Sequence, residues 1–230
     1  MKLVAGIDEA GRGPLLGPMG LAIVACEEPV RQSLAKAGVK DSKQLSVKKR
    51  TDHARLIRRS CFHAFKRISP TTIDTAVNDP CSSLTALEAI ESANLIIRLS
   101  KKIGSDHTLT RIIIDLPSKN KDSYLALIRK HLPEHLRSIP LIAEYKADQN
   151  HIEVSAASII AKNARDSAIR SFEKKHDIRL GSGYPSDPLT RTSLIKNYDL
   201  LVSEGFARES WAPVRKLKTA RVQSSLDAFQ

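Results

Sequence analysis

The sequence is poor in cysteine and has no long apolar run, and these shortages exclude several classes of protein. Its three cysteines, Cys26, Cys61 and Cys81, are widely spaced and form no C-x-x-C pair, which argues against a disulfide framework and a zinc ribbon. No apolar run approaches the roughly 20 residues of a membrane-spanning helix. Asp8 and Glu9 interrupt the N-terminus before the apolar core of a secretory signal could form. We therefore expect a cytoplasmic protein with no membrane partner.

The motifs of nucleotide and zinc sites are also missing. A dinucleotide-binding G-x-G-x-x-G beginning at Gly11 would need glycine where the chain has Leu16, and no G-K-[ST] marks a P-loop. His131 and His135 are four residues apart, but Pro133 lies between them and the chain has no H-E-x-x-H. These patterns argue against a dinucleotide cofactor and against a zinc ion.

The composition is that of a globular protein with an excess of positive charge. Of the 230 residues, 41% are hydrophobic and 27% are charged, which is enough apolar material for one domain or two small ones. The 37 basic and 25 acidic residues give a net charge of +12 and a pI near 9.8. This excess indicates a polyanionic partner without naming it.

Apolar patterning predicts an α/β domain built on a mixed sheet with interleaved helices. Short apolar or alternating runs predict strands at residues 3–7, 19–25, 63–68, 111–115 and 141–145, the second antiparallel to the first. Helical spacing and helix-start residues predict helices at residues 47–60, from 69 onward, and at 84–99, 123–131 and 154–176. A Gly- and Pro-rich loop near Ser182 indicates a boundary before a small helical appendage.

Four carboxylates follow the predicted strands. Asp8, Glu9 and Asp115 come directly after apolar runs, and Asp148 follows another strand by three residues. Strand ends at one edge of a sheet converge, and converging carboxylates need cations to offset their repulsion. Mg²⁺ or Mn²⁺ suits oxygen ligands, and two such ions can hydrolyse a phosphodiester. A lone aspartate is more often a helix cap or a surface salt-bridge partner, whereas an adjacent Asp8 and Glu9 after an apolar run gain little structurally and favour the metal site.

Three loop segments suit a nucleic-acid substrate. Gly11-Arg12-Gly13 would let backbone amides and a guanidinium approach a phosphate or ribose, although a plain turn is the alternative. Lys40, Ser42 and Lys43 offer two ammonium groups and a hydroxyl to a phosphate, or form a solvated charge run. Tyr184 could stack on a base or sugar, or pack its loop onto the core.

The sequence resembles ribonuclease HII, the type 2 ribonucleases H, and most closely their archaeal branch. The resemblance runs from residue 5 to about residue 211 and rests on six blocks in the family's order. These blocks are Gly6-Ile-Asp-Glu-Ala-Gly-Arg-Gly-Pro14, Lys40-Asp-Ser-Lys-Gln-Leu45, Ile114-Asp115, Lys146-Ala-Asp148, Ser155-Ala-Ala-Ser-Ile-Ile-Ala-Lys162 and Gly181-Ser-Gly-Tyr-Pro185.

The resemblance implies a ribonuclease H-like α/β fold and a metal-dependent endonuclease. It implies a catalytic domain over residues 1–181, a helical extension over 182–221 that contacts substrate, and a tail over 222–230. The substrates implied are RNA/DNA hybrids and duplex DNA carrying single ribonucleotides, cut by a monomer to give 3′-hydroxyl and 5′-phosphate ends. The resemblance makes Asp8, Glu9, Asp115 and Asp148 the ligands of Mg²⁺ or Mn²⁺. Its implied substrate-binding residues are Gly11, Arg12, Gly13, Lys40, Ser42, Lys43, Lys146, Ser155, Lys162 and Tyr184.

Within this set the resemblance gives two loops distinct roles. Gly11-Arg12-Gly13 matches the segment that senses the 2′-hydroxyl, and Tyr184 matches the tyrosine that stacks beneath the next sugar. A 2′-hydroxyl is what distinguishes RNA from DNA at a given position.

The C-terminal tail is similar to a sliding-clamp-binding box. Gln223, Leu226 and Phe229 occupy its conserved glutamine, aliphatic and first aromatic positions, while Gln230 stands where a second aromatic is usual. Leu226 and Phe229 could fill a hydrophobic pocket on the clamp. The alternative is a polar tail without a function.

Two other classes of protein compete with the endoribonuclease. A hybrid-binding module without turnover would be expected to lose a carboxylate, and all four are present. A DNA-directed resolvase or integrase on the same fold would lack the Gly11-Arg12-Gly13 segment and the loop that holds Lys40 and Lys43.

Overall fold

The computed structural model describes the backbone of residues 1–39 and 45–227, and their side chains as far as residue 223. Lys40, Ser42, Lys43 and Phe229 lie outside the described residues, and so does the side chain of Leu226. By internal packing the chain divides into two compact units. Unit 1 comprises Met1–Ala10, Gly20–Arg67 and Thr85–Arg165, and unit 2 comprises Gly11–Met19, Ile68–Leu84 and Asp166–Gln230.

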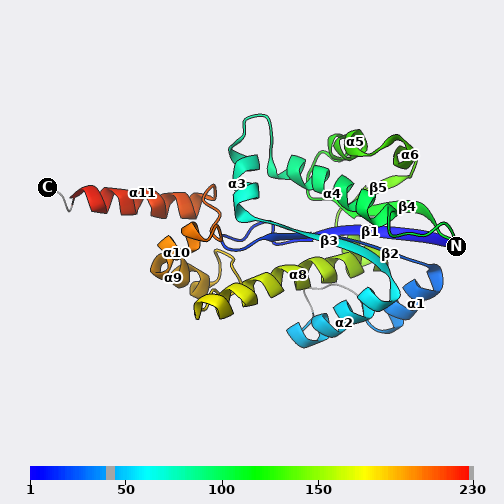
Figure 1. The fold of residues 1–230 in the computed structure, drawn as a ribbon, viewed down its shortest axis with the longest axis horizontal. Helices are drawn as coiled ribbons and strands as arrows, with labels where there is room; N and C mark the ends of the chain where they lie inside the picture. The colour runs from blue at the N-terminus through cyan, green and yellow to red at the C-terminus, as the bar shows by residue number, and fades with distance from the viewer. Residues whose placement is uncertain (40–44, 228–230) are drawn as a thin grey trace. The chain divides into compact units, whose positions relative to one another are not determined.

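A five-stranded mixed sheet forms the centre of unit 1 (Figure 1). Its order is β3-β2-β1-β4-β5, with β1 antiparallel to β2 and parallel to β4, and β4 parallel to β5. The strands are β1 (Lys2–Ala10), β2 (Met19–Cys26), β3 (Phe62–Ile68), β4 (Thr108–Asp115) and β5 (Leu141–Glu144). All five strands predicted from the sequence are confirmed.

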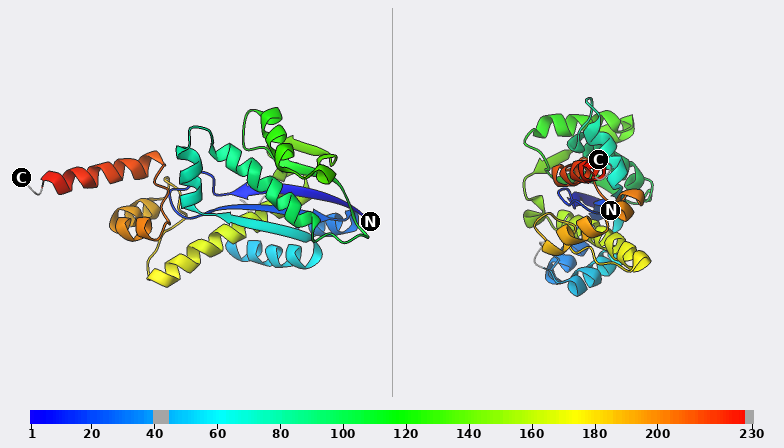
Figure 2. Two further views of the ribbon diagram at one scale, coloured as in Figure 1. Left: turned by 45° about the horizontal axis from the view of Figure 1, so that its top comes forward. Right: turned by 90° about the vertical axis from the view of Figure 1, so that its left-hand side faces the viewer.

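Helices cover both faces of this sheet because its central strands are apolar on both sides. In β2, Leu21 and Ile23 join the core on the face of α4 (Leu84–Ser100) and α5 (Lys121–His131). The alternate residues Ala22 and Val24 join a second core. That core contains side chains of α1 (Glu28–Lys36), α2 (Val47–Ser60) and α8 (Ile152–His176). The strand period of two thus divides one strand between two cores, and Figure 2 shows the layers from other sides.

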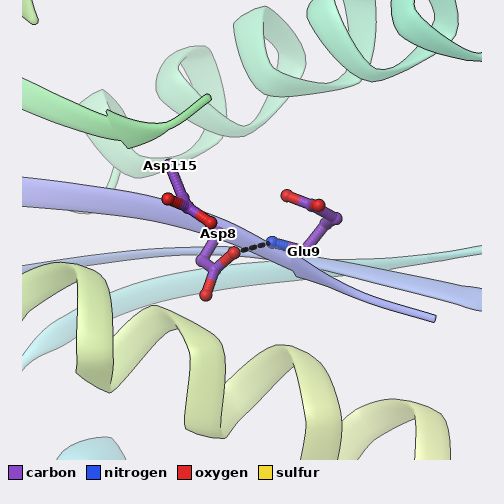
Figure 3. Close-up of side chains that lie close together, drawn as sticks. All are labelled: Asp8, Glu9 and Asp115. Atoms are coloured by element: carbon purple, nitrogen blue, oxygen red, sulfur yellow. Dashed lines mark hydrogen bonds between the residues drawn. The ribbon is translucent and has the colours of Figure 1, made fainter. Parts of the chain in front are cut away.

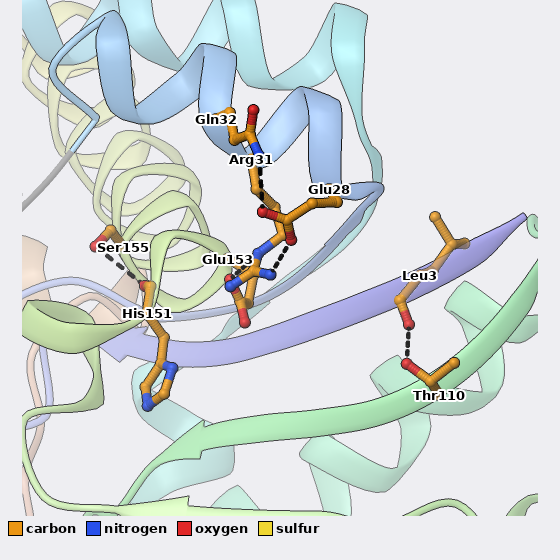
Figure 4. A network of polar contacts seen from close by, with 8 residues as sticks. All are labelled: Leu3, Glu28, Arg31, Gln32, Thr110, His151, Glu153 and Ser155. Carbon is orange, nitrogen blue, oxygen red and sulfur yellow. Dashed lines mark hydrogen bonds and ion pairs between the residues drawn. The ribbon is translucent and has the colours of Figure 1, made fainter.

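The start of α8 lies directly on β1. A Cβ at Gly6 would stand 2.3 Å from the backbone nitrogen of Val154, so only glycine permits this approach. The first turn of α8 also contacts α1. Arg31 Nε of α1 donates to Oε2 of the fully buried Glu153 of α8 at 3.0 Å (Figure 4). The sheet, α1 and the first turn of α8 therefore hold one another at this point.

Helix starts follow the capping residues that the sequence supplies. Ser46 accepts a hydrogen bond from the Lys49 amide at the start of α2, and Ser69 accepts one from Thr72 at the start of α3 (Pro70–Asn78). The sequence analysis did not predict α1, although Pro29 in its first turn is a typical helix-start residue. Two further short helices in unit 1 are α6 (Glu134–Arg137) and α7 (Ala147–Asn150).

Unit 2 is built from helices packed around a core of its own. The helices are α3, the end of α8, α9 (Pro188–Lys196), α10 (Tyr198–Ser203) and α11 (Ala212–Asp227). Leu15 and Leu16, from the segment that follows β1, are buried in this core beside Phe172, Leu201 and Phe206. Unit 2 therefore contains the glycine-arginine-glycine segment as well as the C-terminal helices.

The mixed α/β architecture and the C-terminal helix agree with the expected fold class. The domain boundary at residue 181 stays a prediction, because the packing units group residues by contact and do not test which part folds alone. Over the described parts of the chain, no helix is both long and apolar enough to span a bilayer.

Candidate active site

Three carboxylates meet at the ends of two neighbouring parallel strands. In the pairing of β1 with β4, Ile7 lies beside Ile114, so Asp8 and Asp115 are the next residues of each strand. Ligand oxygens of Asp8, Glu9 and Asp115 all lie within 4.8 Å of one another (Figure 3). The expected convergence of these strand ends is confirmed for these three side chains.

Asp8 is the most enclosed of the three. It is 4% exposed, its Oδ1 accepts a hydrogen bond of 2.7 Å from the Glu9 amide, and the Ser158 hydroxyl of α8 donates to the same carboxylate. Burial raises the pKa of Asp8 well above its usual value, and the negative charges of Glu9 and Asp115 raise it further. The two hydrogen bonds act in the opposite direction but do not cancel this effect.

The donor set of this cluster fits a divalent cation. Three carboxylates offer only oxygen, the ligand that Mg²⁺ and Mn²⁺ prefer. Burial and then mutual repulsion raise the pKa of Asp8, and a bound cation would offset the repulsion. Asp8, Glu9 and Asp115 are therefore the residues that would hold the metal.

Asp148 lies next to this cluster but outside the group of three. It is buried in α7, directly after Ala147, whose amide donates to Asp115 Oδ1 at 2.8 Å. Lys146 has a left-handed backbone with a φ of 55°, which turns the chain from β5 into α7. The turn thus places Asp148 one residue after the amide that binds Asp115, whereas Asp8 and Asp115 belong to the strands themselves.

A small polar network joins α7 to the start of α8, and Figure 4 shows its contact between Ser155 and His151. The Ser155 hydroxyl donates to the backbone carbonyls of Asp148 and His151. His151 in turn lies with its Nε2 atom 2.8 Å from Glu144 Oε2 at the end of β5. The hydroxyl of Ser155, expected at the substrate, is thereby engaged in supporting Asp148.

The other expected substrate contacts divide between the two units. Lys146 is exposed and Lys162 is half-buried on α8, both in unit 1 with the carboxylates. Gly11, Arg12, Gly13 and Tyr184 all belong to unit 2, where a Cβ at Gly13 would stand 3.8 Å from Tyr184 Cε1. The tyrosine ring therefore lies beside the glycine-arginine-glycine segment.

Two polar residues that contact expected site residues were not singled out from the sequence: Ser158 binds Asp8, and Arg208 binds Gly11 and Arg12. Ser158 lies within a recognised block, one helical turn after Ser155, and that spacing could have placed it on the same face of α8. Arg208 is fully buried behind Gly11 and Arg12. Its contacts join residues nearly two hundred positions apart, which no local pattern reveals.

Comparison of the sequence with models of known families identifies the family of this chain. The ribonuclease HII family model matches residues 5–214. The chain belongs to the ribonuclease HII family. A ribonuclease HII of Methanococcus maripaludis strain C6 is 38% identical over 219 residues, which are 94% of this chain and 87% of that relative. With several archaeal relatives at 35–40% identity, the chain is of the archaeal type.

Solved structures of ribonuclease HII proteins share the fold. The ribonuclease H2 from Pyrococcus horikoshii OT3 matches with a TM-score of 0.79 and 32% identity, over 95% of this chain and 98% of that chain. The Archaeoglobus fulgidus ribonuclease HII, solved in complex with PCNA, matches with a TM-score of 0.76 and 32% identity, over 91% and 95%. The fold is thus ribonuclease H-like, as expected.

Membership of the ribonuclease HII family defines the enzyme class. The chain is a ribonuclease H, an endonuclease that hydrolyses the RNA strand of RNA/DNA hybrids. Enzymes of this class depend on divalent metal ions, which agrees with the carboxylate cluster.

Proposed function

We propose that this ribonuclease HII also incises duplex DNA on the 5′ side of single embedded ribonucleotides, using two Mg²⁺ or Mn²⁺ ions and a water nucleophile. The products carry 3′-hydroxyl and 5′-phosphate ends. The observation that supports the metal-dependent chemistry is the cluster of Asp8, Glu9 and Asp115 at the adjacent ends of β1 and β4.

The carboxylates have one task in this proposal, which is to hold cations against the scissile phosphate. When bound, two divalent ions supply an activated water and stabilise the leaving oxygen. Asp8 is fixed by the Glu9 amide and by Ser158, and Asp115 by the Ala147 amide. Asp148, carried by α7, is the proposed fourth ligand.

Recognition of the substrate is assigned to loops and to the basic surface. Gly11, Arg12 and Gly13 sense the 2′-hydroxyl, and Tyr184 beside them stacks on the following sugar. Phosphates are contacted by basic and hydroxyl side chains, for which we propose Lys40, Ser42, Lys43, Lys146 and Lys162. With a net charge of +12, affinity for any duplex should fall steeply with salt.

A sliding clamp is the proposed protein partner. The support is the complex of the A. fulgidus ribonuclease HII with PCNA, together with the tail residues Gln223, Leu226 and Phe229. Tethering to a clamp would raise the local concentration of the enzyme on DNA without changing its chemistry.

The first experiment maps cleavage of three duplexes by the purified protein, with Mg²⁺ and then with Mn²⁺. The duplexes are DNA with one ribonucleotide, the same sequence as DNA alone, and an RNA/DNA hybrid. We expect a nick 5′ of the lone ribonucleotide and an intact all-DNA duplex. Binding without a cut would favour a silent module, and cleavage of plain DNA would mean that the 2′-hydroxyl is not read.

Asp8→Asn tests the role of the metal site. We expect cleavage to be lost while the duplex is still bound, because a metal ligand is removed and the basic surface is unchanged. Asp52→Asn is the matched control, since Asp52 is an exposed residue of α2 paired with Arg55 at 3.2 Å. Full activity of Asp8→Asn would contradict the assignment.

A further inference from the structure

Arg208 is a fully buried arginine whose guanidinium donates hydrogen bonds to three backbone carbonyls. It is 0% exposed, and its Nη2 donates to Gly11 O at 2.7 Å and to Gly17 O at 3.0 Å. Its Nη1 donates to Arg12 O at 2.8 Å, and its Nε to Gly17 O at 3.2 Å. All four residues belong to unit 2. One side chain therefore holds both ends of the segment 11–17.

The guanidinium is suited to this task because its donors are fixed in one plane. Arginine carries five N–H donors on a rigid fork, whereas the ammonium of lysine is a single point on a flexible stem. Burying a charge is costly unless its donors find partners, and here three carbonyl oxygens accept from it. Few other side chains could span Gly11, Arg12 and Gly17 at once.

These contacts fix the direction of two peptide groups. No peptide bond among the described residues is cis, and in a trans peptide the C=O and the N–H point to opposite sides. Because the carbonyls of Gly11 and Arg12 face Arg208, the amides of Arg12 and Gly13 face away from it. Gly11 has a φ of 87°, a backbone conformation that favours glycine.

Arg208 is itself held in place from several directions. Its amide donates to Leu15 O at 2.9 Å, and the ring of Trp211 lies 5.1 Å from its guanidinium carbon. The next two amides, of Glu209 and Ser210, donate to the Asp74 carboxylate of α3 at 2.8 and 2.9 Å. The guanidinium is therefore anchored before any substrate is present.

We propose that Arg208 is the positioning residue for 2′-hydroxyl recognition: it orients the Gly11–Arg12 and Arg12–Gly13 peptides so that their amides present donors to the ribose. This rests on the proposed function, in which Gly11, Arg12 and Gly13 read the ribonucleotide. Arg208 does not touch substrate in this account, and its effect is on discrimination between a ribose and a deoxyribose.

The test compares Arg208→Lys with the unchanged protein on two duplexes that differ by one 2′-hydroxyl. Binding is measured in EDTA, where no cleavage occurs, and cleavage of the ribonucleotide duplex is measured with Mg²⁺. We expect the preference for the ribonucleotide duplex to disappear while affinity for all-DNA duplex is unchanged. Cleavage should fall by about 10²-fold, as expected for a misplaced recognition element.

Two controls separate this role from a general loss of stability. Arg31→Lys disrupts another arginine with two acceptors, Glu28 and Glu153, and should leave the ribonucleotide preference intact. Arg208→Gln repeats the test without a buried ammonium, and melting curves identify the folded fraction of each variant.

The possible outcomes are distinct. A folded Arg208→Lys that keeps the ribonucleotide preference would overturn the role of Arg208 alone. If the protein without any substitution shows no preference for the ribonucleotide duplex over the all-DNA duplex, the proposed function is overturned as well. An equal loss of affinity for both duplexes would mean that Arg208 serves the fold and not recognition.

Discussion

Asp8 illustrates how a proposed metal-binding role and the stability of the fold oppose one another in a single side chain. Its carboxyl is buried, and two more carboxylates lie close to it, so the pKa is raised by desolvation and then by Glu9 and Asp115. Each unit of such a rise costs the ionised form about 1.4 kcal/mol. Without metal, the folded protein therefore keeps a carboxyl whose ionised form is destabilised, at a position that we propose binds metal.

Asp8→Asn should stabilise the metal-free protein. The amide keeps the shape of the carboxyl but carries no charge, so the desolvation and repulsion that raise the pKa of Asp8 are removed. We expect a higher melting temperature in EDTA, by about 2–4 °C for each kcal/mol gained. Differential scanning calorimetry measures this, with Asp52→Asn as the surface control.

The size of this gain should depend on pH in a defined direction. A folded-state pKa above the unfolded one means that the folded protein binds the proton more tightly, so stability falls as pH rises through the interval between the two values. At low pH Asp8 is protonated and resembles asparagine, and the difference between the variants should vanish. A difference that grew as pH fell would contradict the raised pKa.

The carboxylates were predictable from the sequence to different degrees. Asp8, Glu9 and Asp115 could be identified because an apolar run ending in an acid marks a strand end, and parallel strand ends meet. The place of Asp148 depends on the left-handed turn at Lys146 and on the short α7, neither of which has a periodic signal. The role of Arg208 could not be predicted from the sequence, because its hydrogen-bond partners Gly11 and Arg12 are remote from it along the chain.

At the scale of elements, the site depends on the contact between β1 and α8. Ser158 reaches Asp8 from α8, and the helix can lie that close only because Gly6 has no side chain. The strands and most long helices were predictable, since their apolar periods are clear over many residues. Helix α1 was missed because it is short and rich in polar residues.

Gly6→Ala should destabilise the protein strongly. The new methyl group would stand 2.3 Å from backbone atoms of Glu153 and Val154, which cannot yield as a flexible side chain would. Overpacking typically costs about 1–3 kcal/mol, and we expect the upper end of this range or more. Thermal unfolding measures the loss. Gly104→Ala is the matched control, since a Cβ there meets nothing within 4 Å and should change the melting temperature little.

At the scale of the whole molecule, the proposed binding to DNA combines diffuse positive charge with a tail that resembles a clamp-binding box. The net charge of +12 favours binding to any duplex without regard to sequence, and in the proposed function the loops supply the specificity. The exposed Gln223 lies late in α11, so the motif that resembles a clamp-binding box begins within a helix. The tail therefore offers a contact that is separate in sequence from every carboxylate of the site.

Phe229→Ala should weaken clamp binding without affecting cleavage of short duplexes. The aromatic ring is the proposed anchor in a hydrophobic pocket, and the carboxylates are unchanged. Isothermal titration with the clamp and a cleavage assay on free oligonucleotides give the two readouts. Ser225→Ala, at a variable position of the motif, is the control. Unaltered clamp affinity of Phe229→Ala would refute the role of the tail.

The pairing of β1 with β4 also sets the order in which this enzyme can be completed during its synthesis. β1, β2 and β3 all lie within the first 68 residues, but β4 ends only at Asp115. At about 5–20 residues per second, the ribosome needs roughly 5–20 s to pass from the end of β1 to the end of β4. Throughout that interval one edge of β1 has no partner strand and is open to pairing with other chains. The central position that gives β1 its part in the carboxylate cluster thus makes it, of the three interior strands, the one that waits longest for its second partner strand.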